Sequence, residues 1–337
     1  MVRARKYVVK NRFQGSPKRS DYSIIEQDLP PLKDGEILVK TEWISVDPYL
    51  RAYNSAYPVP YDQFAFQVGV VQESKDPNHP VGSRIVSHKG WCNYSVVNMS
   101  APFPSPENRH YKLPNIGNLS PSLAVGALGM PGATAYLAFL ETGQPKPGET
   151  VVITGAGGAV GSLVGQIAKI KGCNVIGFTG SDKKAQLLKE ELGFDKAFNY
   201  KSVNIEKALQ EAAPNGVDIY FDNVGGEISS TIMYQMNYKG RVIVVGSISS
   251  YNSSANQLPQ VTLVQPAILF KSLKVEGFLI WNWSLEQWNE AFVEIVKWIE
   301  SGQLKAKEHI SEGFDNLFDV FIGMLNGDNF GKAVVRI

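Results

Sequence analysis

Five glycines stand close together in the middle of the chain, in the stretch VVITGAGGAVGSLVG at residues 151–165. The apolar residues before them predict a buried strand, and the apolar spacing after them predicts a helix. Glycine allows a sharp turn and a close backbone approach to another molecule, while a helix start presents unpaired N–H groups. The stretch therefore predicts a site for the pyrophosphate of a dinucleotide, with a tight turn that binds no ligand as the alternative.

The end of the next predicted strand bears on which dinucleotide would bind. An NAD site usually has a carboxylate at this strand's tip, where it accepts hydrogen bonds from the ribose 2′-hydroxyl. Here the strand ends in Phe178-Thr179-Gly180-Ser181, and Asp182 falls in the first turn of the following helix, where an acidic residue is favourable. Lys183 and Lys184 come next and suit a 2′-phosphate. We therefore expect NADPH rather than NADH; a solvated helix face is the alternative for the lysines.

Metal-ligating residues are scarce. The chain has two cysteines and four histidines at no spacing typical of a metal site: Cys92, Cys173, His79, His88, His110 and His309. We expect no metal, both cysteines as small buried hydrophobic residues, and His88 as a surface or packing residue. Without a Lewis acid, reduction of a C=C bond conjugated to a carbonyl is easier than oxidation of an unactivated alcohol. Hydride would reach the β-carbon, and the protein would stabilise the enolate and exclude water.

The elements that must position these residues fall into three stretches. Residues 1–125 are rich in β-branched residues, aromatics and turns, as at 36–46 and 82–97, which is typical of a barrel or sandwich. From 150 to about 280, predicted strands and helices alternate, which indicates an α/β fold with a doubly wound parallel sheet. An amphipathic helix over 285–302 follows, and the chain ends with a short helix and a strand.

Composition limits the class of protein. With 33 basic and 32 acidic side chains, 44% hydrophobic residues and 337 residues, the chain is typical of a two-domain globular enzyme. We expect no nucleic-acid partner, because no basic run stands out. No apolar segment approaches the length of a membrane span, and the N-terminus lacks a signal-peptide core, so we expect a cytoplasmic protein that does not bind membranes.

Several motifs point to one family. They are GAGGAVGSLVGQIAK, SVDPYLR (45–51), GMPGATAY (129–136), FNYK (198–201), YFDNVGG (220–226), GSISSYN (246–252) and GDNFGK (327–332). Together they resemble the medium-chain dehydrogenase/reductase superfamily. Within it they resemble the zinc-independent prostaglandin reductases, also called leukotriene B4 12-hydroxydehydrogenases or alkenal double-bond reductases.

The resemblance implies a fold, an assembly and a cofactor. It implies a Rossmann domain at 127–295 inserted into a β-rich GroES-like catalytic domain formed by 1–126 and 296–337. It also implies a homodimer that uses NADPH. The implied cofactor residues are Gly158, Ala159, Val160 and Gly161 at the pyrophosphate, Lys184 with Tyr200 at the 2′-phosphate, and Asn223, Val245, Gly246, Ser247, Ile248, Ser249, Ser250, Tyr251, Phe278, Leu279, Ile280 and Asn329 along the rest. Lys183 stays open as the alternative to Lys184.

The expected catalytic groups are hydrogen-bond donors to the enolate oxygen. The candidates are Tyr49, Tyr251 and the ribose hydroxyl of the cofactor; a surface-loop aromatic is the alternative for Tyr251. Arg51 is interpreted equally as a structural ion pair or a substrate contact. Phe270 stands where several relatives carry a tyrosine considered as a proton donor, so either that role is dispensable or the substrate differs.

The resemblance implies an NADPH-dependent oxidoreductase that reduces the C=C bond of 2-alkenals and enones, with 15-oxo-prostaglandins and leukotriene-type lipids as further candidate substrates. The aromatic stretch at 53–66 is interpreted as a substrate pocket or as ordinary packing. Two other functions stay open. One is an NADPH quinone oxidoreductase, and the other is a cofactor-binding protein without catalysis, including an RNA-binding one.

Overall fold

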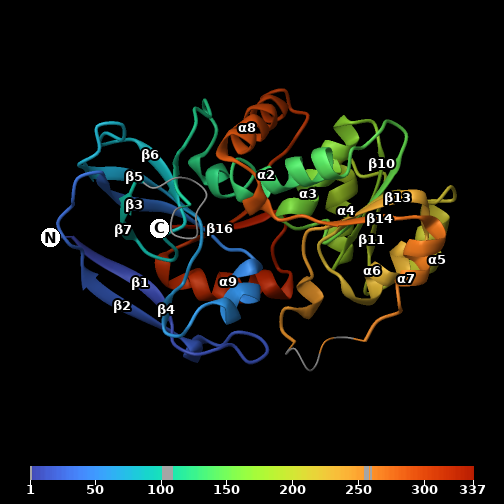
Figure 1. The fold of residues 1–337 in the computed structure, drawn as a ribbon, viewed down its shortest axis with the longest axis horizontal. Helices are drawn as coiled ribbons and strands as arrows, with labels where there is room; N and C mark the ends of the chain where they lie inside the picture. The colour runs from blue at the N-terminus through green and yellow to red at the C-terminus, as the bar shows by residue number, and fades with distance from the viewer. Residues whose placement is uncertain (1, 101–108, 254–257, 259) are drawn as a thin grey trace.

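A six-stranded parallel sheet forms one lobe of the computed structural model, which describes residues 2–100, 109–253, 258 and 260–337. Its strands run in the order β11-β10-β9-β12-β13-β14 (Figure 1). They are β9 (Thr150–Thr154), β10 (Asn174–Thr179), β11 (Lys196–Asn199), β12 (Val217–Asp222), β13 (Met236–Val244) and β14 (Lys274–Gly277). The chain order reverses between β9 and β12, and at such a switch point a doubly wound sheet binds ligands.

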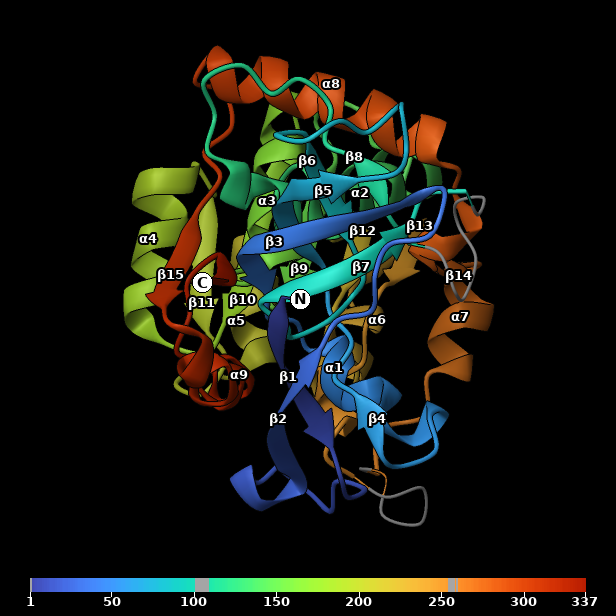
Figure 2. The same ribbon diagram turned by 90° about the vertical axis from the view of Figure 1, so that its left-hand side faces the viewer.

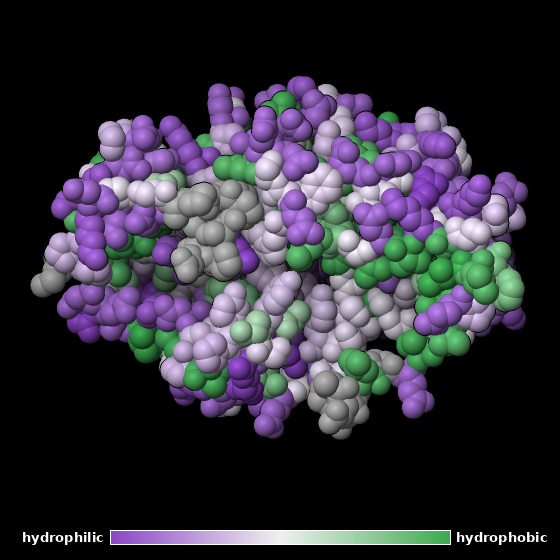
Figure 3. Space-filling model, viewed as in Figure 1, coloured by the Kyte–Doolittle hydropathy of each residue, from purple (hydrophilic) through white to green (hydrophobic). Residues whose placement is uncertain are grey.

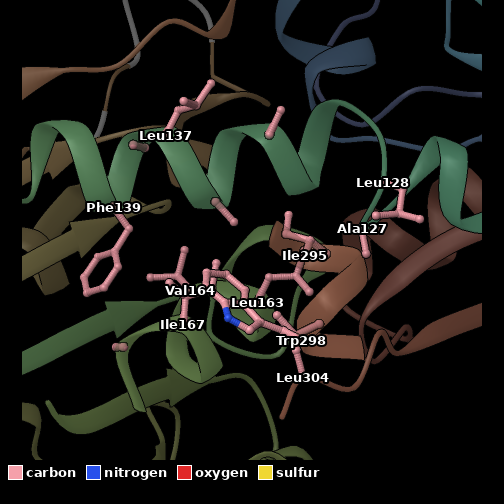
Figure 4. Close-up of a cluster of buried hydrophobic side chains, with 14 of the residues drawn as sticks. Ala127, Leu128, Leu137, Phe139, Leu163, Val164, Ile167, Ile295, Trp298 and Leu304 are labelled. Carbon is pink, nitrogen blue, oxygen red and sulfur yellow. The ribbon is translucent and has the colours of Figure 1, made fainter. Parts of the chain in front are cut away.

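Helices cover both faces of this sheet. They are α2 (Met130–Leu137), α3 (Ala159–Ile170), α4 (Asp182–Leu192), α5 (Ile205–Ala212), α6 (Gly226–Met233) and α7 (Gln265–Lys271). Helix α8 (Leu285–Glu300) packs on α2 (Figure 1). The core against one face includes Leu137 and Phe139 beside Val164 and Ile167 of α3 (Figure 4). The other face is covered by a second core that includes residues of α5, α6 and α7. The sheet is therefore buried on both sides, as its continuous Val/Ile runs predict.

The second lobe is rich in β-structure. One sheet contains β1 (Arg3–Val9), β2 (Tyr22–Asp28) and β4 (Tyr61–Asp62). A seven-stranded sheet contains β3 (Glu36–Ser45), β5 (Gln67–Ser74), β6 (Arg84–Ser87), β7 (Tyr94–Asn98), β8 (Tyr111–Lys112), β15 (Glu308–Glu312) and β16 (Lys332–Arg336). Two helices accompany these sheets, α1 (Tyr49–Ala52) and α9 (Leu317–Asn326). Figure 2 shows the red strand β15 in the same lobe as the blue β3.

The C-terminal strands belong to the N-terminal sheet. Strand β16 pairs antiparallel with β3, with Val334 opposite Ser45, and β15 pairs parallel with β16. The expected fold class, a Rossmann sheet with a β-rich GroES-like lobe, is confirmed. The expected domain boundary between residues 295 and 296 falls inside α8, so as a boundary it would divide a continuous helix.

The β-rich stretch at 82–97 is not one strand. Strand β6 ends at Ser87 and β7 begins at Tyr94, and the residues between them form a turn that contains Gly90 at a φ of +87°. A Cβ at Gly90 would lie 1.9 Å from the carbonyl oxygen of Gln63, so the chain turns here against another backbone segment. His88 follows the end of β6 at this break, and its ring packs against Phe66 and Trp281.

Candidate functional site

The predicted cofactor residues gather at one edge of the parallel sheet. Because all six strands run in the same direction, their carboxyl ends lie at this edge. The pairs Phe178–Thr154, Thr179–Asn199 and Val244–Gly277 hold these ends in register. The residues that follow the strand ends include the glycine turn after β9, Tyr200 after β11, Asn223 after β12, Val245 after β13 and Phe278 after β14.

The glycine turn between β9 and α3 is tightly packed on its inner side. Gly155 has a φ of +62°, and a Cβ at Gly161 would lie 2.5 Å from the Gly155 carbonyl oxygen. The start of α3 can therefore approach the turn only because residue 161 lacks a side chain. At Gly158 a Cβ would contact only the Gly155 oxygen, at 3.3 Å, so the outer side of this residue is open.

The first turn of α3 has no side-chain cap. Helices α4 and α5 are capped by Ser181 and Asn204, whose side-chain oxygens accept the N–H groups of Lys184 and Lys207 at 3.3 and 3.0 Å. The residue at the corresponding position of α3 is Gly158, which has no side chain to accept them. The first N–H groups of α3 and the positive end of its dipole therefore face the open side of the turn, which fits a pyrophosphate.

The groups expected around a 2′-phosphate lie beside this turn. The Lys184 ammonium group donates to the Gly327 carbonyl, and its aliphatic chain lies against Gly157. Burial lowers the pKa of Lys184, and the nearby Lys201 adds to that effect. Lys183, the alternative, is exposed on the outer face of α4. The structure thus places Lys184, and not its neighbour, next to the glycine turn.

Tyr200 and Lys201 lie together over the end of β10. A Cβ at Gly180 would lie 3.7 Å from the Tyr200 hydroxyl and 3.8 Å from Cε of Lys201. The Lys201 ammonium group is 5.9 Å from the centre of the Tyr200 ring. Two lysines and one phenol therefore converge here, which suits a dianionic phosphate. Lys201 belongs to the FNYK motif, but sequence reasoning did not predict a role for it.

The segment after β13 forms a second wall of the site. The Asn223 side chain donates to the Thr154 carbonyl at 2.8 Å, and the backbone N–H of Ile248 donates to the Asn223 carbonyl at 3.3 Å. The Tyr251 hydroxyl accepts the Ser247 N–H at 3.3 Å. Residues Val245 to Ser250 are partly exposed, so their backbone is accessible. Tyr251 is half-buried and folded back onto this loop, not extended into solvent.

The remaining expected cofactor residues differ in exposure. The Phe278 ring stacks on Trp283 with ring centres 5.8 Å apart, and the side chain of Leu279 is 45% exposed. Ile280 is buried in the core, so only its backbone can contact a ligand. Asn329 donates to the Gly331 carbonyl at 2.7 Å, which fixes it near the glycine turn.

Tyr49 lies in a partly buried aromatic cluster. Its hydroxyl is 3.1 Å from Nε2 of His88. Phe64 stacks on both rings, with centres 5.9 and 5.8 Å away, and Trp281 packs against His88 edge-on. His88 is therefore a packing residue, as one of the two interpretations held, but its polar edge contacts a predicted catalytic group. Sequence reasoning missed this contact.

Arg51 forms no ion pair within the described residues; its hydrogen bonds go to neutral groups. Its Nε donates at 3.0 Å to the Gly15 carbonyl and at 3.0 Å to the Asn252 side chain. The Asn252 contact ties α1 to the loop that carries Tyr251, so Arg51 joins the two walls of the site. Phe270 lies on α7 with 79% of its surface exposed, and no described contact connects it to Tyr49 or Tyr251.

A buried ion pair connects the glycine turn to the segment that carries Tyr49. The Lys332 ammonium group donates to the carbonyls of Val46 and Ala333 at 2.7 and 2.6 Å, and it lies 3.2 Å from Oδ1 of Asp47. The side chains are only 3% and 5% exposed. The preceding residue, Gly331, donates its N–H to the Gly157 carbonyl at 2.8 Å.

The cysteines are buried, as expected. Cys92 and Cys173 are free thiols, 6% and 1% exposed, and burial raises the pKa of each to about 11. Among residues 2–100, 109–253, 258 and 260–337, no three His, Cys, Asp or Glu side chains are grouped in a way that could hold a metal ion. Within that same part of the chain, no helix is both long and apolar enough to cross a bilayer.

The chain is similar to known families and to known proteins. The family described as "Zinc-binding dehydrogenase" matches residues 159–300, and "N-terminal domain of oxidoreductase" matches residues 5–104. Prostaglandin reductase 1 of Bos taurus is 42% identical over 343 residues, covering 100% of both chains. NADPH-dependent curcumin reductase of Escherichia coli is 34% identical, covering 99% of this chain and 97% of its own. The crystal structure of CurA from Vibrio vulnificus in complex with NADPH superposes with a TM-score of 0.89 at 33% identity, covering 98% of each chain.

The fold and the matched regions define a member of the medium-chain dehydrogenase/reductase superfamily. At about two-fifths identity over its full length, the chain belongs within that superfamily to the prostaglandin reductase family.

Removing the Lys332 ammonium group tests the buried ion pair. We expect Lys332→Met to lower the free energy of unfolding by about 3–5 kcal/mol, because Asp47 and two backbone carbonyls lose their partner in a dry environment. Urea denaturation measures the change. The double variant Asp47→Asn/Lys332→Met should recover part of it, since no buried charge remains unpaired. A decrease in the free energy of unfolding of less than about 1 kcal/mol would mean that the ion pair contributes little to stability.

Proposed function

We propose that this protein is an NADPH-dependent oxidoreductase that reduces the C=C bond of α,β-unsaturated aldehydes and ketones. The observation that carries the proposal is the uncapped glycine turn at the sheet's switch point, with Lys184 and Lys201 beside it. Two relatives that are similar over nearly their whole length are named prostaglandin reductase 1 and NADPH-dependent curcumin reductase. Their names support both NADPH as the cofactor and reduction as the reaction. A cytoplasmic location accords with two free, buried thiols.

The proposed cofactor contacts follow the sheet edge. The backbone N–H groups from Gly158 to Gly161 would bind the pyrophosphate, and Lys184 with Tyr200 would bind the 2′-phosphate. Asn223, the loop from Val245 to Tyr251, the segment 278–280 and Asn329 would line the rest. Bound NADPH would supply a hydride to the β-carbon of the substrate.

The chain's own task is then to stabilise negative charge on the carbonyl oxygen. Tyr49 and Tyr251 each offer one phenolic O–H. Burial raises the pKa of both hydroxyls above the ordinary value, so both groups stay protonated at neutral pH and act as donors. Tyr53 is close to both tyrosines: its ring centre is 6.2 Å from that of Tyr49, and it interacts electrostatically with Tyr251. The two proposed donors therefore share Tyr53 as a neighbour.

The aromatic cluster around Tyr49 would keep water from the reacting atoms. Phe64, Phe66 and Trp281 surround the His88 ring, and Phe66 and Trp281 stack with centres 6.0 Å apart. Excluding water strengthens a hydrogen bond to a developing enolate oxygen. The same apolar walls suit a hydrophobic enone or alkenal.

The protein is also proposed to form a homodimer through the free edge of the parallel sheet. Strand β14 ends the sheet, and Val275 on it is 41% exposed. Leu269 and Phe270 of α7 are 70% and 79% exposed beside it. Figure 3 shows a hydrophobic surface over this part of the molecule. An unpaired strand edge beside an apolar patch is suited to pairing with a second copy.

A substrate panel tests the proposed reaction. We expect the purified protein to oxidise NADPH with 2-alkenals and enones and to leave saturated aldehydes unreacted, because only the conjugated alkene accepts hydride at the β-carbon. Loss of NADPH absorbance measures the rates. Faster turnover of 1,4-quinones than of any enone would favour a quinone reductase instead, and NADPH binding without turnover would favour a non-catalytic protein.

Substitution of Lys184 tests the phosphate site. Lys184→Ala should raise KM for NADPH by about tenfold to a hundredfold and change KM for NADH little, because the lost charge-assisted hydrogen bonds involve only the 2′-phosphate. Lys183→Ala is the matched control and should leave both values near those of the wild type. Equal losses for the two cofactors would contradict the assignment.

The dimer proposal predicts a mass of twice the 37.1 kDa of one chain in solution. Val275→Lys should shift the protein toward monomer, since it adds a charge at the strand edge. Light scattering after size-exclusion chromatography measures the mass. Val293→Lys, at a 54% exposed position of α8, is the control and should stay dimeric. A wild-type monomer at micromolar concentration would rule the dimer out.

A further inference from the structure

The contact between Tyr49 and His88 joins two side chains that are both partly buried. Their polar atoms are 3.1 Å apart, and their ring planes are inclined by 22°. Phe66 packs against the edge of His88 with ring centres 4.8 Å apart, so the imidazole has little freedom to rotate. The contact therefore has a fixed geometry, and the remaining variable is the direction in which the hydrogen bond runs.

That direction decides what the Tyr49 hydroxyl can do. A phenol has one proton to donate, whereas its oxygen can accept two hydrogen bonds. If His88 accepts from Tyr49, the phenolic proton is used inside the protein. If His88 donates through Nε2–H, the proton stays available for a ligand. The backbone N–H of Phe66 also interacts with the Tyr49 oxygen, which makes that oxygen an acceptor on the protein side.

His88 is a neutral imidazole at neutral pH. Burial lowers its pKa to about 3, and the positive charge of Arg109 lowers it in the same direction. The Arg109 guanidinium group is held over the Trp281 ring at 3.8 Å, next to the cluster. A neutral imidazole carries its proton on one nitrogen only, so the tautomer fixes the direction of the hydrogen bond.

We propose that His88 is a positioning residue for the reduction: it donates Nε2–H to the Tyr49 oxygen and so directs the single phenolic proton of Tyr49 to the carbonyl oxygen of the substrate. The inference rests on the proposed enone reductase function and adds to it the group that orients one donor. Tyr49 remains the group that contacts substrate. Phe270 has no hydroxyl and lies exposed on α7, so it cannot donate a proton. Tyr49 would be the donor instead.

Two substitutions at His88 separate hydrogen bonding from packing. His88→Leu keeps a buried apolar side chain but removes the donor, and we expect kcat for an enone to fall by about tenfold with little change in KM for NADPH. His88→Gln restores an N–H donor near the position of Nε2 and should recover most of the rate. His309→Leu, at an exposed position of β15, is the control for loss of a histidine.

A double-mutant cycle links the effect to Tyr49. In a Tyr49→Phe background, His88→Leu should cause no further loss of kcat, because no phenolic proton remains to be directed. Equal losses in both backgrounds would assign His88 a merely structural role. A rate that rises in the single variant would show that His88 accepts from Tyr49. A wild-type protein without enone turnover would instead defeat the proposed function, and the next measurement still tests the hydrogen bond.

The tautomer can be measured without any substrate. In protein labelled with 15N-histidine, the imidazole nitrogen shifts distinguish Nε2–H from Nδ1–H, and loss of one set of signals in His88→Gln assigns them. We expect His88 to be neutral with the proton on Nε2 throughout the pH range of the folded protein. The Nδ1–H tautomer, or a protonated imidazole at neutral pH, would overturn the inference.

Discussion

The buried ammonium group of Lys332 is the interaction on which the arrangement of the site depends. Strand β16 brings it back to the N-terminal sheet, where it binds the carbonyl of Val46 and the carboxylate of Asp47, just before Tyr49. The residue before it, Gly331, binds the glycine turn. One dipeptide thus connects the cofactor turn with the segment that carries the proposed donor, and a shift of either would strain the other.

Much of the parallel-sheet lobe could be predicted from local sequence. Alternation of apolar strands with amphipathic helices identified a doubly wound sheet, because a short repeat of this kind is visible in any window of about 30 residues. The membership of β15 and β16 in the N-terminal sheet could not be predicted from local pattern. Strand β3, which pairs with β16, lies almost 300 residues earlier, and only the family resemblance indicated that the C-terminal segment returns.

In the candidate site, too, some residues could be predicted from local sequence and others could not. The glycine turn and Lys184 carry their signal in neighbouring residues, and the structure brings them together. The Tyr49–His88 contact spans 39 residues, and the Arg51–Asn252 contact spans 201. Nothing in the types or spacing of these residues indicates such contacts. A lone histidine beside a tryptophan is more often a packing residue, and only the break between β6 and β7 turns it toward Tyr49.

The burial of both thiols has a consequence for a protein that handles electrophiles. Conjugated aldehydes alkylate cysteine by Michael addition, and the attacking species is the thiolate. With a pKa of about 11, Cys92 and Cys173 are almost wholly in the unreactive thiol form at neutral pH, and neither sulfur is open to solvent. At neutral pH both thiols are therefore far less reactive toward such aldehydes than an exposed thiol of lower pKa would be.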